Sequence, residues 1–389
     1  MKHLTMKYIP ILMLFMVVGF SGTARAQWIP DPTINAIIDD GIRDTYNMKF
    51  ADADRAFRRV VAAYPDHPAG HFFLAMVEWW RILIDIDDES RDDRFHDMLD
   101  DVIDLCDKRL DRNERDIAGL FFKGGAIGFQ GRLHANRKSW IKAATRGREA
   151  LPVVMDAAEI APENADLAFG TGIYDYYAAV LPDRYSVLKP LMMFLPDGDR
   201  ERGIRELKHA AENARFANWE AMYFLMQVYY GEENKPSNAL TYARRLMRAF
   251  PDNPVFHRYY GRTYVKLGNW RRAADVFSDI RERVKKGKRG YSTKMEREAL
   301  YYLGYDAMLR KEYRTAMRYF VACDKLSRGL DSDGPSGFMV MANLRMGMTH
   351  DLLGERKYAV KQYRKVLRMP EFRGSHELAE RYRKSPYKR

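Results

Sequence analysis

GRTYVKLGNWRRAADVF, residues 261–277, is the stretch of this 389-residue chain that decides its fold. It places Ala273 twelve positions after Gly261 and Phe277 four positions after the alanine. The same spacing of a glycine, an alanine and an aromatic residue recurs at Gly41/Ala53/Phe57, Gly304/Ala316/Phe320 and Gly347/Ala359/Tyr363. A spacing that returns in this way indicates one structural unit used several times.

The repeated unit is expected to be a hairpin of two antiparallel helices. The small residues allow the helices to cross closely, and the aromatic residue fills the wedge against the next helix pair. Because one hairpin cannot bury its apolar face alone, several must stack. The sequence therefore predicts an all-α solenoid with a long concave surface, which is typical of a scaffold.

Turn residues divide the chain into successive hairpins. The sequence Pro-Asp-His-Pro at 65–68 ends a first hairpin that starts at Ile34, and Pro-Asp-Asn-Pro at 251–254 closes a later one. Further helix pairs are expected from Ala69, over 113–161, over 164–214 with an insertion at 181–199, over 219–250, and in three hairpins after Pro254. The tail, 375–389, is expected to be a frayed end or a capping helix.

These residues resemble the tetratricopeptide repeat family, whose unit places a small residue in helix A, an alanine and an aromatic residue in helix B, and a proline at its close. Gly41, Ala53, Phe57 and Pro65 match that pattern. The unit at 220–253 departs from it, since it keeps Ala239 and Pro251 but has Gln227 where glycine or alanine is usual. The resemblance implies a right-handed superhelical solenoid and covers about two thirds of the mature chain.

A looser likeness concerns two short segments. Residues 119–125 and 194–200 resemble tetratricopeptide proteins of the mitochondrial outer-membrane, inclusion-body-clearance type. This likeness implies an adaptor-like binding role without catalysis.

The first 26 residues predict a signal peptide. Lys2 and Lys7 precede an apolar run at 8–20, and Ala-Arg-Ala at 24–26 has the form of a cleavage site. The alternative is a membrane anchor, although the run is shorter than the ~20 residues of a spanning helix. No cysteine follows the run, which argues against a lipoprotein. We expect cleavage near Ala26, export to a bacterial periplasm, and no transmembrane segment in the mature chain.

Charge divides the mature chain into two parts. The chain as a whole carries +12, of which 235–389 carries +20, while 27–234 carries about −11. This polarity predicts an acidic N-terminal domain at 27–234, basic repeats at 235–374 and a basic tail. It could steer acidic partners, or allow head-to-tail self-association. Export makes nucleic acid a poor candidate partner.

No motif of a known catalytic, cofactor or metal site is found, so the chain is predicted not to be an enzyme. The glycine-rich run at 124–131 lacks the Lys-Ser or Lys-Thr of a phosphate loop and is interpreted as close helix packing. His67 and His71 have no further ligand nearby. The acidic stretch 85–93 lacks the glycine and glutamate of a calcium loop and is interpreted as solvated. Cys106 and Cys323 are expected to be buried, with a disulfide between them as the less favoured alternative.

The concave face of the basic repeats is the main candidate site. Family positions on helix A assign to it Arg258, Arg262, Tyr301, Tyr305, Met308, Leu344 and Met348. Arginine can grip a carboxylate, and tyrosine or methionine can accept an extended chain, so the main hypothesis is a non-catalytic adaptor for a protein or peptide in the cell envelope.

Two further hypotheses stay open. A small-molecule or envelope-polymer binder or enzyme would use the aromatic-rich region 164–199, with Tyr174, Tyr176, Tyr177 and Tyr185. A closed apolar pocket there would favour this hypothesis, and an open groove would favour the first. The third hypothesis is a self-associating structural subunit.

Overall fold

The computed structural model describes residues 29–185 and 195–388, and every regular element in that part of the chain is an α-helix. The predicted signal peptide and residues 186–194 of the predicted insertion lie outside the described residues. The elements are α1 (Pro32–Tyr46), α2 (Phe50–Ala63), α3 (Pro68–Ile84), α4 (Asp92–Leu110), α5 (Ile117–Asn136), α6 (Trp140–Ile160), α7 (Leu167–Arg184), α9 (Arg200–Asn213), α10 (Asn218–Tyr230), α11 (Pro236–Ala249), α12 (Pro254–Lys266), α13 (Trp270–Lys285), α14 (Thr293–Leu309), α15 (Tyr313–Leu330), α16 (Gly337–Leu352), α17 (Arg356–Val366) and α18 (Ser375–Lys384).

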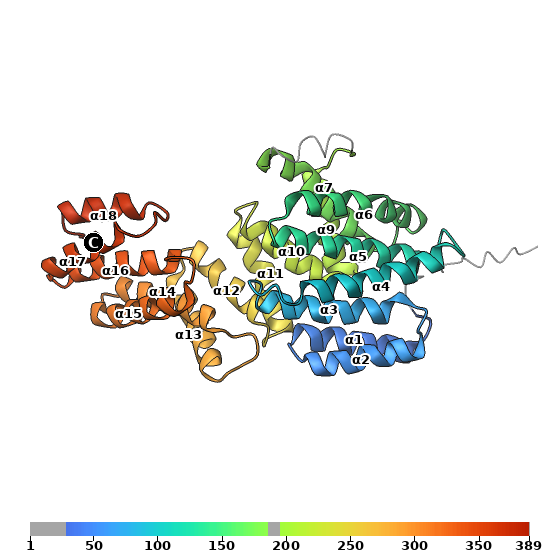
Figure 1. Ribbon diagram of the computed structural model, residues 1–389, viewed down its shortest axis with the longest axis horizontal. Helices are drawn as coiled ribbons and strands as arrows, with labels where there is room; N and C mark the ends of the chain where they lie inside the picture. Colours follow the sequence, from blue (N-terminus) through green and yellow to red (C-terminus); the bar gives the residue numbers. More distant parts are fainter. Residues whose placement is uncertain (1–28, 186–194, 389) are drawn as a thin grey trace, which may run out of the picture.

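Consecutive helices pack as antiparallel hairpins that stack along an elongated molecule (Figure 1). The predicted fold class is therefore confirmed, and the tail contains a helix, α18, that packs on α17. The cysteines are confirmed as free and buried, and burial raises the pKa of each thiol to about 12.

The glycines of the repeated spacing lie directly beneath the aromatic rings of their own hairpins. A Cβ atom on Gly304 would stand 2.7 Å from Phe320 Cε1, and one on Gly347 would stand 2.5 Å from Tyr363 Cε1. The rings also reach the next hairpin, as expected, since Phe277 lies 4.6 Å from Tyr302 between ring centroids. Because a methyl group would overlap the ring, these positions are filled to capacity.

A left-handed turn residue marks the same point in six hairpins. It stands seven positions after the repeat glycine at Met48, Gly268, Lys311 and Gly354, and Lys138 and Asn234 are its counterparts in two further hairpins. The φ of all six residues lies between 48° and 77°. This shared turn sets a common register for the six hairpins. In that register, Gly131 and Gln227 occupy the position that Gly261 holds in its own hairpin.

The helices α1–α11 close into one turn, which we call the closed turn. Although 174 positions separate them, the Tyr46 hydroxyl donates to Glu220 of α10 over 2.9 Å. Trp80 of α3 lies 5.8 Å from Tyr223 of α10 between ring centroids. The hairpin of α1 and α2 thus packs against the hairpin of α10 and α11. One apolar core runs from Ile29 through the closed turn into α12.

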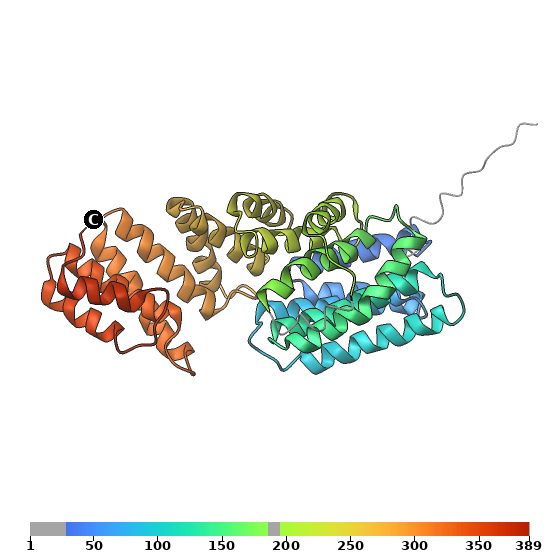
Figure 2. The same ribbon diagram turned by 90° about the horizontal axis from the view of Figure 1, so that it is seen from above.

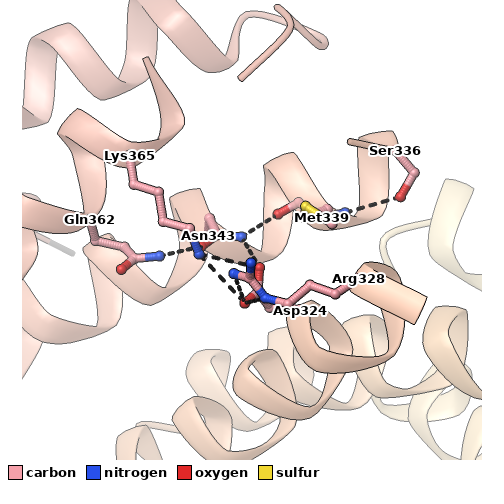
Figure 3. Close-up of polar contacts among 7 residues, drawn as sticks. All are labelled: Asp324, Arg328, Ser336, Met339, Asn343, Gln362 and Lys365. Carbon is pink, nitrogen blue, oxygen red and sulfur yellow. Dashed lines mark hydrogen bonds and ion pairs between the residues drawn. The ribbon is translucent and has the colours of Figure 1, made fainter. Parts of the chain in front are cut away.

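The helices α12–α18 form an arm that extends away from the closed turn (Figure 2). A polar network fixes its last repeats, as Figure 3 shows. The buried Asn343 amide of α16 donates to Asp324 of α15 over 2.5 Å, and its oxygen accepts from Lys365 over 2.5 Å and from Gln362. Arg328 also pairs with Asp324. Because each group in the network has a partner, it holds α15, α16 and α17 in register.

Candidate ligand cavity

The closed turn contains a cavity of about 620 Å³. Ligand pockets in proteins commonly measure roughly 300–1,000 Å³. Helices α1, α3, α5, α6, α7 and α10 supply its walls, and Tyr259 of α12 reaches it from the arm. Its walls are mainly apolar and include Phe72, Phe73, Met76, Trp80, Phe121, Phe129, Trp140, Leu151, Val154, Phe169, Ile173, Leu181, Phe216 and Phe224.

The hairpin of α5 and α6 lacks the aromatic ring of the repeat. In the shared register its three positions are Gly131, Ala143 and Gly147, so glycine stands where four other hairpins have phenylalanine or tyrosine. Without a ring between them the helices meet directly, and a Cβ on Gly131 would stand 3.3 Å from the Ala143 carbonyl oxygen. A Cβ on Gly147 would meet nothing within 4 Å. All three residues line the cavity.

The glycine-rich run at 124–131 is helical and lies within α5. Gly124 and Gly125 lie against Val154 and Phe72, as close helix packing requires. Gly128 differs, because a Cβ there would meet nothing within 4 Å and the residue lines the cavity. The run therefore serves packing at two positions and leaves open space at a third.

The hairpin of α10 and α11 departs from the repeat in the opposite sense. Gln227 replaces the small residue of helix A, and Ala243 stands at the ring position of helix B. Gln227 lines the cavity, and its amide nitrogen donates to the hydroxyls of Tyr223 and Tyr259, each over 3.3 Å. The exchange of large and small residues turns a polar group inward.

An ion pair lies in the wall of the cavity. Arg132 of α5 donates to Glu220 over 2.9 Å and to the Gln227 side-chain oxygen over 3.3 Å. Its guanidinium carbon also lies 5.1 Å from the centroid of the Trp79 ring and 5.5 Å from that of Tyr223, as in cation–π contacts. Burial acts to lower the pKa of Arg132, but Glu220, together with the neighbouring tyrosines, outweighs burial and the pKa is raised. The arginine therefore stays charged.

The aromatic-rich region 164–199 takes part in this cavity. Tyr174, Tyr177 and Tyr185 line it, and Tyr185 stacks on Trp140 with ring centroids 4.5 Å apart. Tyr176 is instead fully buried and donates to Glu233 over 2.9 Å. An apolar pocket with polar groups is therefore present at 164–199, with walls from residues outside that region and with exposed residues such as Arg148 at its edge.

The predicted arginines of the C-terminal groove are already occupied. Arg258 and Arg262 both pair with Glu298, whose side chain is 1% exposed, with N–O distances of 2.6 and 2.5 Å. Burial on its own would raise the pKa of Glu298, yet the two arginines hold it below its usual range. The prediction that these two arginines are free to bind the carboxylate of a partner is therefore corrected, because the chain itself supplies the carboxylate.

The other predicted groove residues divide into two sets. Met308, Leu344 and Met348 are buried in the core of the arm, because their turns of helix A face neighbouring helices. Tyr301 and Tyr305 are half-buried.

The sequence interpretation did not include Arg345, whose guanidinium carbon lies 4.5 Å from the centroid of the Tyr305 ring. Within residues 29–185 and 195–388, no carboxylate pairs with Arg345.

The acidic stretch 85–93 is tied to the rest of the molecule. Arg137 donates to Asp92 over 2.6 Å and to backbone carbonyls of the stretch. Lys294 of α14 donates to Asp87 over 2.7 Å, and this hydrogen bond lowers the pKa of that carboxyl. The stretch is a loop whose Asp85, Asp87 and Glu89 side chains are largely exposed, as predicted, and these contacts join it to α5 and α14.

No family model and no curated protein matches the chain. Among solved structures, a human IFIT1 dimer with PPP-AAAA is similar over 82% of this chain and 68% of that chain, at 13% identity and a TM-score of 0.43. A likeness of that degree carries no argument about function.

Proposed function

We propose that this protein is a non-catalytic binding scaffold whose principal site is the cavity of the closed turn, and that the ligand is a small, mainly apolar molecule. The observation that carries this proposal is the place of the two departures from the repeat. Gly147 and Gln227 break the pattern in separate hairpins, and both line the same cavity. Departures from a local rule are expected where function outweighs packing.

A test of this proposal uses the neutral apolar dye N-phenylnaphthylamine, whose fluorescence rises in an apolar site. We expect the parent protein to bind the dye and Gly128→Leu to weaken binding about tenfold or more, because the new side chain enters the cavity. Gly329→Leu is the matched control, since Gly329 of α15 is also helical with nothing within 4 Å of its Cβ position. Absence of dye binding by the parent, or equal binding by Gly128→Leu, would contradict the proposal.

A second candidate function is the capture of a peptide or protein by the arm, consistent with a tetratricopeptide-like adaptor. Arg345 supports it, because its Nε atom is buried without a hydrogen-bond partner in the described part of the chain. A peptide carboxylate would supply the missing acceptor. Arg345→Gln should abolish capture of a crosslinked partner, whereas Arg258→Gln should have little effect. If Arg258→Gln abolished capture and Arg345→Gln had little effect, the binding role would belong to the arginine pair on Glu298 instead.

Export is the remaining part of the proposed function, and the amino-terminal sequence supports it. In the described residues, no helix is long and apolar enough to cross a membrane. N-terminal sequencing of the protein from its native cells should give Gln27 as the first residue. An intact Met1 on protein from the cell interior would exclude export by signal cleavage.

A further inference from the structure

The charged groups that line the cavity balance one another. Arg132 pairs with Glu220, and at the rim Arg184 pairs with Glu232. Two further charged residues complete the lining, the exposed Arg148 and the buried Asp166. Three basic and three acidic side chains therefore surround a mainly apolar space. A ligand with a full charge would meet no net charge of opposite sign while losing its hydration.

At the polar end of the cavity, hydrogen-bond acceptors and hydrogen-bond donors differ in how many are already engaged. Both Glu220 oxygens are used, one by Tyr46 and one by Arg132, and the Gln227 oxygen also accepts from Arg132. The acceptors on this wall are thus already engaged.

Donors, in contrast, remain open on the same wall. The Tyr223 and Tyr259 hydroxyls accept from Gln227, and in the described part of the chain their own protons have no acceptor. A guanidinium has five N–H groups, of which Arg132 uses one toward Glu220 and one toward Gln227. The wall therefore offers donors to a ligand and needs an acceptor in return.

Resting on the proposed function, we propose that the cavity binds an uncharged amphiphile, an extended apolar body that ends in a carbonyl-type acceptor such as an ester. The apolar body lies along the walls of α5, α6 and α7. The carbonyl oxygen accepts from the open donors of Arg132, Tyr223 and Tyr259. A carboxylate on the same body is disfavoured, because it would stand beside Glu220, which already neutralises Arg132.

Three probes with one chain length separate the steps of this argument: methyl dodecanoate, dodecanoate and dodecane. Each is titrated against N-phenylnaphthylamine bound to the full mature protein at neutral pH. We expect the ester to displace the dye at the lowest concentration. Tyr259→Phe should weaken displacement by the ester about two- to tenfold, the effect of one hydrogen bond, and leave that by dodecane unchanged.

Tyr174→Phe is the control variant, because Tyr174 also lines the cavity but its hydroxyl donates to the Pro196 carbonyl oxygen. It should leave the ranking of the probes unchanged. Displacement by dodecanoate at or below the ester concentration would overturn the charge argument, and equal displacement by dodecane would overturn the polar contact. Either result leaves the proposed function standing. If the parent protein binds neither dye nor any probe, both proposals fail.

Discussion

The closed turn and the arm are built from the same hairpin, yet they use its interior differently. In the arm, each repeat glycine lies under an aromatic ring, so the space between the helices is full. In the closed turn, two of the hairpins with the shared turn register lack the ring, and the cavity of about 620 Å³ lies beside them. One backbone register thus supports either a filled core or a ligand space, depending on two or three side chains.

Buried carboxylates provide the largest expected difference between the regions. Glu298 in the arm serves two arginines and is 1% exposed, whereas Glu220 in the closed turn serves one and is 11% exposed beside the cavity. Glu298→Ala should lower the free energy of unfolding by about 3–5 kcal/mol, because it leaves the positive charges of Arg258 and Arg262 without their carboxylate partner. Glu220→Ala should cost less, since water in the cavity can hydrate Arg132. Urea unfolding of the two variants measures the difference. Equal losses of unfolding free energy would show that the two carboxylates do not differ in this way.

Glycine substitutions test the filled and open interiors directly. Gly304→Leu in the arm should cost about 1–3 kcal/mol or more, because the side chain must displace Phe320. Gly128→Leu in the closed turn should be neutral or stabilise by up to about 1 kcal/mol, since a helical glycine gains propensity and meets nothing within 4 Å. Thermal unfolding of both variants would show the contrast, and a stable Gly304→Leu would contradict the crowded interior.

Acid should weaken both regions through one histidine in each, the half-buried His67 and the buried His257. Burial lowers the pKa of His67 in the closed turn and of His257 in the arm to about 4. The unfolded value is roughly 6.5, so between the two values the unfolded chain binds more protons and stability falls as pH falls. Each histidine contributes at most about 1.4 kcal/mol per pH unit.

The variant His67→Gln/His257→Gln checks this pH dependence. Its unfolding free energy should change less than that of the parent between pH ~6.5 and ~4. An unchanged slope would assign the acid sensitivity to other groups. The two single variants show whether the closed turn or the arm responds more strongly.

The smallest expected effect tests the register that the regions share. Lys311 in the arm and Lys138 in the closed turn are exposed residues with positive φ, where Gly268 and Gly354 hold the same turn position. Lys311→Gly and Lys138→Gly should each stabilise by about 0.5–1 kcal/mol, because the left-handed conformation costs an L-residue about that much. Destabilisation at one site alone, seen in urea unfolding, would show that the two turns are not equivalent.

The sequence predicted the hairpins well and the site only in part. Gln227 was visible as a departure from the repeat, but no neighbouring residue in the chain explained it. The register Gly131, Ala143, Gly147 was missed, because a missing ring leaves no positive signal until the shared turn residue aligns the hairpins. The pairing of Arg258 and Arg262 with Glu298 was also missed, since those residues are 36 to 40 positions apart.

By itself the sequence determined the all-helical hairpins, their turns and the two buried thiols, because each depends on neighbours within one or two helices. Only the tertiary structure decided that the first hairpin meets α10, through Tyr46 and Glu220, and so encloses the cavity. The physical reason is that the path of a solenoid is the sum of many small inter-hairpin rotations. No local pattern records that sum, although it determines whether the concave side becomes an open groove or a closed space.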